Sequence, residues 1–312
     1  MTNNQQTSRL TTVALRQAGL LVIAYIILIF VLPPSQATMH AYHLSTLEYR
    51  CILLAVQLPS LLAWLAAFFG AAKLQQYVQL VRKTDEGPSF NQLATGSSWL
   101  AWSLPVPAIA SLLLNAIAEH WRGFHSTAII LSNYLNLILP LIAFTIIGGA
   151  SLSLIRQAKL NFSLANARII MIIFLFAGVL YCYLTFQRFD LTSLTSTANP
   201  YFLPIWLMVL SVIVPYLYAW FVGLLAAYEI TLISRQTTGV LYRQALRLLV
   251  IGLVAIIVSS ITLQYMNSVQ PRVGHLMLGY QLVLTSIFRV IGGGGFVLMA
   301  LGASRLKKIE EV

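Results

Sequence analysis

The chain has 312 residues, of which 59% are hydrophobic and 9% are charged, and its formal net charge is +11. A soluble domain carries about 25% charged residues, and a water-soluble fold with this composition would expose a large apolar surface. These values exclude an ordinary soluble domain and predict an all-α integral membrane protein. The basic residues lie in short loops between apolar runs, so the charge indicates topology and we expect no nucleic-acid partner.

The N-terminal segment, residues 1–13, is rich in Asn, Gln and Thr and predicts a disordered cytoplasmic tail. Arg9 and Arg16 precede the first apolar run, and Ser35-Gln36-Ala37 resembles a cleavage site, which leaves a cleaved signal peptide open. The internal duplication described below favours retention, because it gives the first span a partner in the second half of the chain.

Eight apolar runs are long enough to cross a bilayer as helices, which satisfy their own backbone hydrogen bonds in lipid. In chain order they lie at about residues 18–32, 50–72, 96–117, 127–154, 169–186, 202–231, 246–264 and 276–302. After the second run, Leu74, Tyr77, Val78 and Val81 recur at helical spacing. This stripe predicts either a helix lying on the membrane surface or a plain extension of span two.

Cations are unequally shared between the two sides that eight spans define. Fourteen Lys and Arg residues lie on one side and four on the other, counted over short loops and termini. The first set is Arg9, Arg16, Lys73, Arg82, Lys83, Arg156, Lys159, Arg168, Arg235, Arg243, Arg247, Arg305, Lys307 and Lys308, and the second is Arg50, Arg122, Arg188 and Arg272. Because cytoplasmic loops carry the excess of cations, we expect a protein of the cell membrane with both termini in the cytoplasm.

Two pairs of similar segments indicate a tandem duplication. They are Leu58-Pro59-Ser60-Leu61-Leu62-Ala63-Trp64 with Val214-Pro215-Tyr216-Leu217-Tyr218-Ala219-Trp220, and Phe144-Thr145-Ile146-Ile147-Gly148-Gly149 with Phe288-Arg289-Val290-Ile291-Gly292-Gly293. Their order and spacing predict two parallel four-helix repeats, at residues 14–160 and 161–304, followed by a cytoplasmic tail at 305–312. The repeats would be related by an axis along the membrane normal, and a ligand site is expected where they meet.

Prolines mark candidate helix kinks. Pro59 and Pro215 occupy matching positions in the two repeats, and Pro105 and Pro107 lie in span three. Interrupted helices expose backbone to the substrate in many transporters, but proline is also common in ordinary membrane helices. Both interpretations stay open at this point.

Arg289 lies about 13 residues into the last span, or roughly 20 Å along a helix, near the bilayer midplane. No acidic residue at matching depth is available, so Arg289 should face the protein interior or water. Its five donors suit a carboxylate or phosphate, although an arginine that only joins helices through carbonyls is the alternative. The candidate ligand-binding residues are Arg289, Asn115, Asn136, Gln281, Trp64 and Trp220.

Two weaker hypotheses concern other polar residues. The offset that aligns Trp64 with Trp220 also aligns Lys73 with Glu229, which predicts an ion pair if their helices approach each other near the axis. A metal site or an external pH sensor would use the five histidines, which all fall on the outer side although their spacing is not diagnostic. These are His40, His43, His120, His125 and His275.

Catalytic, nucleotide and cofactor motifs are missing from the sequence, so we expect neither an enzyme nor a cofactor. One hypothesis is a carrier or permease-like protein that binds a small, anionic ligand between two pseudo-symmetric halves. The other is a membrane sensor, scaffold or complex subunit without transport activity. The expected partners are membrane lipid, a small-molecule ligand and, under the second hypothesis, another membrane protein.

Overall fold

The structure is a computed structural model. It describes residues 3–34, 39, 43, 45–82, 84–121, 125–159, 214–269 and 275–310, with backbone alone at 3–8, 120, 125–130, 133, 264–269, 275–282 and 310. The helices in this part of the chain are α1 (Asn3–Val31), α3 (Thr46–Val81), α4 (Gly87–Trp102), α5 (Pro105–His120), α6 (His125–Gln157), α10 (Val214–Gln236), α11 (Val240–Val269) and α12 (His275–Glu310).

The described residues form helices and loops without strands, and they include seven segments that are long and apolar enough to cross a membrane. This confirms a helical, multi-pass membrane architecture. The predicted fifth span, residues 169–186, and residues 202–213 of the predicted sixth span lie outside the described part of the chain.

Local sequence sets the starts of two helices in the first half of the chain. Ser45 caps α3: its hydroxyl accepts the N–H of Glu48 at 3.3 Å, while the Glu48 carboxylate accepts the N–H of Ser45 at 2.8 Å. This reciprocal pair satisfies two backbone donors that the first helical turn leaves free. α5 begins directly with Pro105, whose missing N–H costs nothing at a first helical position.

The third predicted span is two helices, so of the two interpretations of Pro105 and Pro107 the structure has the interrupted helix. α4 ends at Trp102, and Ser103 and Leu104 separate it from α5. A proline in a continuing helix would lose a hydrogen bond and clash with the carbonyl four residues before it, so the helix breaks here. By contrast, Pro59 lies inside α3, and Pro215 is the second residue of the described α10.

Residues 3–13 of the predicted N-terminal tail are helical, which corrects the expectation of disorder there. α1 begins at Asn3, and the Thr11 hydroxyl accepts a hydrogen bond from the Gln76 amide of α3, which ties this segment to the bundle. α12 continues to Glu310. The stripe after span two is an extension of α3, because Tyr77 is buried and its ring meets the edge of Phe90 at 5.0 Å.

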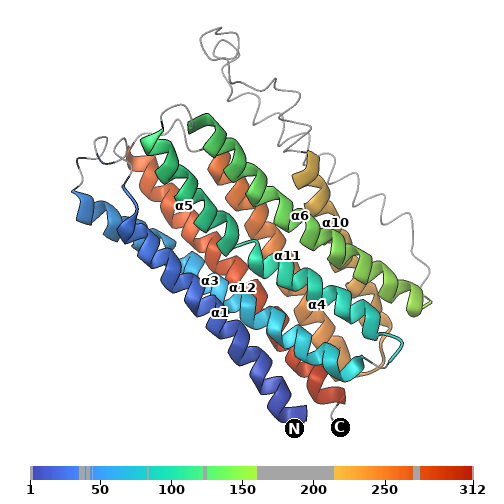
Figure 1. The fold of residues 1–312 in the computed structure, drawn as a ribbon. Helices are drawn as coiled ribbons and strands as arrows, with labels where there is room; N and C mark the ends of the chain where they lie inside the picture. Colours follow the sequence, from blue (N-terminus) through green and yellow to red (C-terminus); the bar gives the residue numbers. More distant parts are fainter. Residues whose placement is uncertain are drawn as a thin grey trace.

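The helices form one bundle in which the described chain begins and ends at the same end (Figure 1). α12 packs against α3 and α11, and α6 packs against α4, α5 and α10. α3 also contacts α1 and α4, and α10 contacts α11. This arrangement places α12 and α6 at the centre of the contacts, each between helices distant in sequence.

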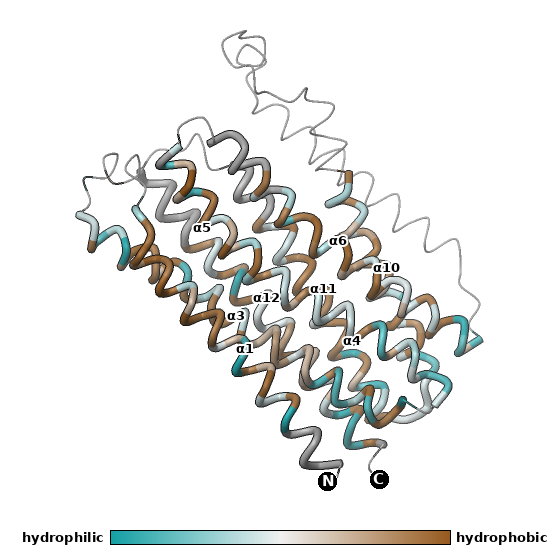
Figure 2. Tube along the Cα trace, viewed as in Figure 1, coloured by the Kyte–Doolittle hydropathy of each residue, from teal (hydrophilic) through white to brown (hydrophobic). Residues whose placement is uncertain are grey.

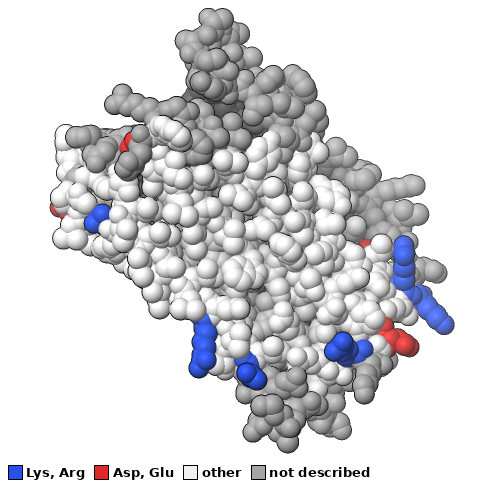
Figure 3. Space-filling model, in the orientation of Figure 1, with Lys and Arg blue, Asp and Glu red and all other residues white. Residues whose placement is uncertain are grey.

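The outer surface of the bundle is apolar. Large hydrophobic side chains such as Leu20, Ile23, Val258 and Leu301 are exposed on it. Figure 2 shows hydrophobic residues along the middle of the bundle, and Figure 3 shows a middle zone without charged residues, with Lys and Arg gathered towards the end where the termini lie. Such a surface suits lipid on its sides and polar solvent at its ends.

Candidate functional site

A cavity of about 460 Å³ lies in the bundle, in the half that points away from the termini. Its apolar floor consists of Leu100, Phe144, Ile256 and Phe296, all buried. The polar side chains of its wall are Tyr25, Tyr49, Gln57, Ser60, Ser103, Ser111, Asn115, Asn136, Tyr216, Ser259, Ser260 and Arg289. A cavity of this size, with an apolar floor and a polar wall, suits a small molecule that has both apolar and polar parts.

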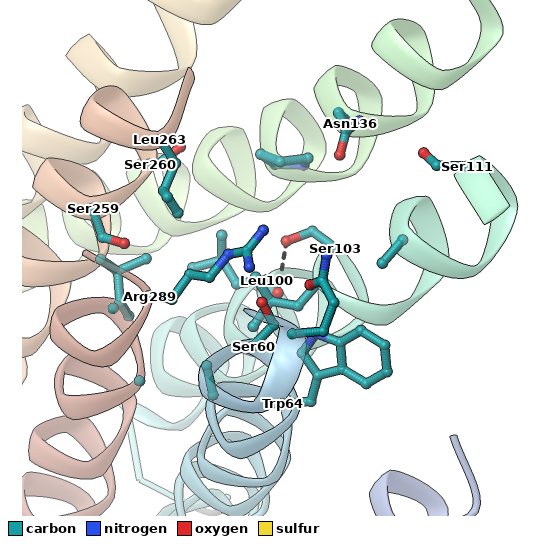
Figure 4. Close-up of a pocket in the computed structure, with 18 of the residues that line it drawn as sticks. Ser60, Trp64, Leu100, Ser103, Ser111, Asn136, Ser259, Ser260, Leu263 and Arg289 are labelled. Carbon is teal, nitrogen blue, oxygen red and sulfur yellow. Dashed lines mark hydrogen bonds between the residues drawn. The ribbon is translucent and has the colours of Figure 1, made fainter. Parts of the chain in front are cut away.

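Arg289 is the one cation among the lining residues, and no acidic residue lines the cavity in the described part of the chain. It reaches the cavity from α12, where Figure 4 shows its guanidinium directed towards Ser103 and Ser60. One of its terminal nitrogens donates to the Val56 carbonyl of α3 at 3.1 Å. Its remaining N–H groups bond no described residue, and the side chain is half-buried.

The acceptor of Arg289 lies in the turn of α3 that precedes Pro59. Proline has no N–H, so the carbonyl of Ala55, four residues earlier, loses its usual helical partner. The neighbouring Val56 carbonyl is the one that accepts from Arg289. The guanidinium is therefore held against α3 by one hydrogen bond while most of its fork is left for the cavity.

Three serine hydroxyl groups of the cavity differ in whether their hydrogen is already used in a hydrogen bond. Ser103 donates to the Leu100 carbonyl at 2.7 Å, as the dashed line in Figure 4 shows, and Ser259 donates to the Phe288 carbonyl at 2.6 Å. Ser260 instead accepts the indole N–H of Trp220 at 3.2 Å, so its own hydrogen remains available.

Two asparagines, Asn115 and Asn136, also line the cavity. The Asn136 amide donates to the Ser132 carbonyl of its own helix at 2.9 Å. Asn115 has no hydrogen bond within the described residues. Arg289, Ser260 and Asn115 are therefore among the donor groups that a bound ligand could use.

The structure brings most of the sequence-predicted ligand residues together. Arg289, Asn115, Asn136 and Trp64 line the same cavity, and Trp220 lies behind it, bonded to the lining residue Ser260. The side chain of Gln281 lies outside the described residues. Sequence reasoning missed the serines and Tyr216, although Tyr216 follows Pro215 as Ser60 follows Pro59, and both line the cavity.

Lys73 and Glu229, the predicted ion pair, contact other residues instead of each other. Lys73 donates to the Gln76 side chain at 3.4 Å and lies over the Phe69 ring, 5.4 Å from its centroid. Glu229 is bonded to Ser151 of α6. α3 packs mainly on α12, α4 and α1, whereas α10 packs on α6 and α11, so Lys73 and Glu229 do not form the expected pair.

The metal hypothesis rests on side chains that lie almost entirely outside the described part of the chain. Only His43 has a described side chain, and it lies exposed at a turn with φ of 52°. The side chains of His40, His120, His125 and His275 fall outside the described residues, so the metal site stays a prediction.

A scan against protein-family models, a search of the curated proteins and a search of the solved structures each found no match to this chain.

Proposed function

We propose that the protein is a non-enzymatic membrane carrier that binds a small anionic ligand in the cavity, with Arg289 as the anion-binding group. The observation that carries the proposal is the state of Arg289: one carbonyl partner, a half-buried guanidinium, and a cavity of about 460 Å³ in front of it. The described lining contains no carboxylate that could neutralise it. A carboxylate or phosphate would complete its planar fork.

Energetics favour an anion over a purely structural role for Arg289. An arginine at the centre of a membrane helix costs at least about 2.5 kcal/mol on insertion scales. One bond to a neutral carbonyl leaves the charge uncompensated, whereas a bound anion supplies both charge and acceptors. The hydrogen of Ser260 and the amide of Asn115 add neutral donors, which fits an anion with several oxygen atoms.

The carrier class is favoured by the way helices of the two proposed repeats pack. If α3 corresponds to α10, α4 to α11 and α6 to α12, then each contact among these six helices has a counterpart. The contact of α3 with α12 corresponds to that of α10 with α6, and α4 with α6 corresponds to α11 with α12. Such parallel repeats, related by an axis along the membrane normal, are a known basis of alternating access.

The two helix pairs α3–α12 and α10–α6 also each contain a glycine in close contact with a phenylalanine of the other helix. A Cβ on Gly70 of α3 would lie 2.8 Å from the Phe296 carbonyl of α12, and one on Gly223 of α10 would lie 2.8 Å from the Phe144 ring of α6. This relation pairs Phe144 with Phe296, whereas the sequence match paired it with Phe288. Both phenylalanines belong to the cavity floor, so the cavity lies where the proposed halves meet.

A ligand screen tests the binding step. The purified protein in lipid nanodiscs is heated with small carboxylates, phosphates and uncharged analogues, because a ligand that binds the folded state raises the melting temperature. We expect stabilisation by some anions and by none of their uncharged analogues. Arg289→Lys should weaken the effect because it keeps the charge but loses the fork.

Arg50→Lys is the matched control for this screen. Arg50 is also half-buried and donates to a backbone carbonyl, that of Leu32 at 3.4 Å, but it does not line the cavity. Its replacement should leave the anion response unchanged. An equal loss in both variants would assign the response to general charge and contradict the proposed site.

Transport is tested separately in sealed vesicles. Vesicles preloaded with the anion that the screen selects should take up labelled anion by exchange, and Arg289→Lys should slow this exchange. Binding without exchange would overturn the carrier assignment and favour a membrane sensor instead.

A further inference from the structure

Glu229 is a buried acidic side chain that the cavity does not use. Its residue is 2% exposed, and it lies on α10 with its carboxyl group against Ser151 of α6. Ser151 follows Phe144 of the cavity floor by about 10 Å along α6, at 1.5 Å per residue. The two residues therefore meet on the side of the floor that faces the termini.

The hydrogen bonds of Ser151 bear on whether this carboxyl group carries a proton. The Ser151 hydroxyl contacts two oxygen atoms, a carboxyl oxygen of Glu229 and the Gly148 carbonyl at 2.9 Å. A hydroxyl group has one hydrogen, so it can donate to only one of them. If Glu229 is protonated, its O–H donates to Ser151 and Ser151 donates to Gly148, and every contact is a proper hydrogen bond.

An ionised Glu229 would be poorly compensated here. Among the described residues Ser151 is its one hydrogen-bond partner, and no lysine or arginine pairs with it. A carboxylate in an apolar interior is strongly disfavoured unless it is paired, whereas a protonated carboxyl needs only one acceptor for its hydrogen.

Among the charged and titratable groups on the helices around Glu229, two bond other residues and three are exposed. Arg243 of α11 donates to the Thr237 carbonyl at 2.7 Å, and Tyr242 donates to Glu86 at 3.1 Å. The exposed groups are Arg156 of α6, Arg235 of α10 and Arg247 of α11, while Tyr228 of α10 is half-buried and adjacent in sequence.

The geometry points to Glu229 as a proton-binding site: it holds a proton in this conformation, donates it to Ser151 and thereby joins α10 to α6 beneath the cavity floor. Loss of the proton leaves a buried carboxylate, which favours separation of the two helices and entry of water. Proton release would thus loosen the packing below Phe144, on the side of the cavity towards the termini. The inference does not depend on whether the cavity binds an anion.

Infrared spectroscopy of the protein in nanodiscs tests the protonation directly, because a protonated carboxyl has a carbonyl stretch distinct from that of a carboxylate. We expect a carboxylic-acid band at neutral pH that is lost in Glu229→Gln and retained in Glu119→Gln, an exposed control. Ser151→Ala should shift the band by removing its hydrogen-bond partner. A wild-type spectrum without this band, or a band that Glu229→Gln leaves intact, would overturn the proposal.

Thermal unfolding at neutral and alkaline pH gives a second readout. Raising the pH removes the proton from Glu229 in the wild type and should lower its melting temperature, and Glu119→Gln should behave in the same way. Glu229→Gln stays uncharged and should lose less stability over the same range. A Glu229→Gln protein with the full wild-type loss would contradict the site.

Discussion

Arg289 and Glu229 are both ionisable residues inside apolar helices, but their surroundings give them different chemistry. Arg289 keeps free donors in front of a cavity, whereas Glu229 is packed against one hydroxyl group. An arginine cannot lose its proton in a protein, so it requires an anion or water, while an acid can become neutral. We therefore expect an anion-binding site at Arg289 and a proton-binding site at Glu229.

The contact between Trp220 and Ser260 provides a residue-scale prediction. Trp220→Phe removes the indole N–H that reaches Ser260 at 3.2 Å while keeping an aromatic ring. We expect a loss of about 0.5–1.5 kcal/mol in unfolding free energy, as for one neutral hydrogen bond. Ser260→Ala in the same background should add less than it does alone, because the bond is already lost.

Denaturant unfolding of the two single variants and the double variant measures this coupling. Strictly additive losses in the double variant would mean that Trp220 and Ser260 do not support each other across α10 and α11.

At the residue scale, the depth of a residue in its span could be predicted from the sequence better than the residue that it contacts. The depth of Arg289 follows from counting along one apolar run, and the sequence alone makes Asn115 and Asn136 candidate ligand-binding residues. Whether a side chain faces a neighbouring helix or lipid depends on helix rotation and packing, which a single sequence does not encode clearly. For this reason Glu229 was assigned to Lys73 although α10 packs on α6.

At the element scale, close helix packing depends on particular glycines. A Cβ on Gly252 of α11 would lie 2.5 Å from the Gly295 carbonyl of α12, and one on Gly295 would lie 2.6 Å from the Gly252 carbonyl. The two backbones touch, as small residues allow in membrane helices. Gly294, one residue away, has nothing within 4 Å of such a Cβ.

Gly252→Ala should therefore destabilise the protein by about 1–3 kcal/mol, the usual cost of overpacking. Gly294→Ala should be neutral or stabilising by up to about 1 kcal/mol, because alanine favours helix. Unfolding in detergent with increasing denaturant compares the pair. Equal stability of the two variants would show that α11 and α12 do not approach each other at Gly252.

The spans were readable from sequence, but one break was not. Hydropathy averages over a window, and the window covering α4 and α5 is apolar throughout, so it reads as a single span. Pro105 and Pro107 indicated an interruption, but a proline can kink a helix or end it, and the choice depends on neighbouring helices. Pro140 inside α6 shows that the same residue type is tolerated within a helix of this protein.

At the scale of the whole molecule, the bundle has an apolar middle and a cation-rich end at which the described chain begins and ends (Figures 1 and 3). We propose from the cation bias of the sequence that this end lies in the cytoplasm. With that orientation the cavity lies towards the outer face of the membrane and Glu229 towards the inner one.

Cysteine labelling tests this orientation. In a variant with Cys51 and Cys182 replaced by serine, a cysteine at Glu119 should react with an impermeant maleimide on intact cells, because it is exposed at the outer end of α5. Cysteines at Arg82 and Lys307 should react only after the cells are opened. Labelling of these two positions in intact cells would invert the topology.

The most direct test of the central claim is calorimetric titration of the anion that stabilises the protein best. A hydrogen bond to a charged group contributes about 1.5–3 kcal/mol, and 1.4 kcal/mol is about tenfold in affinity. Arg289→Gln should therefore bind at least about tenfold more weakly than the wild type, while Arg50→Gln should match the wild type. Unchanged affinity in a folded Arg289→Gln protein would contradict an anion site at Arg289.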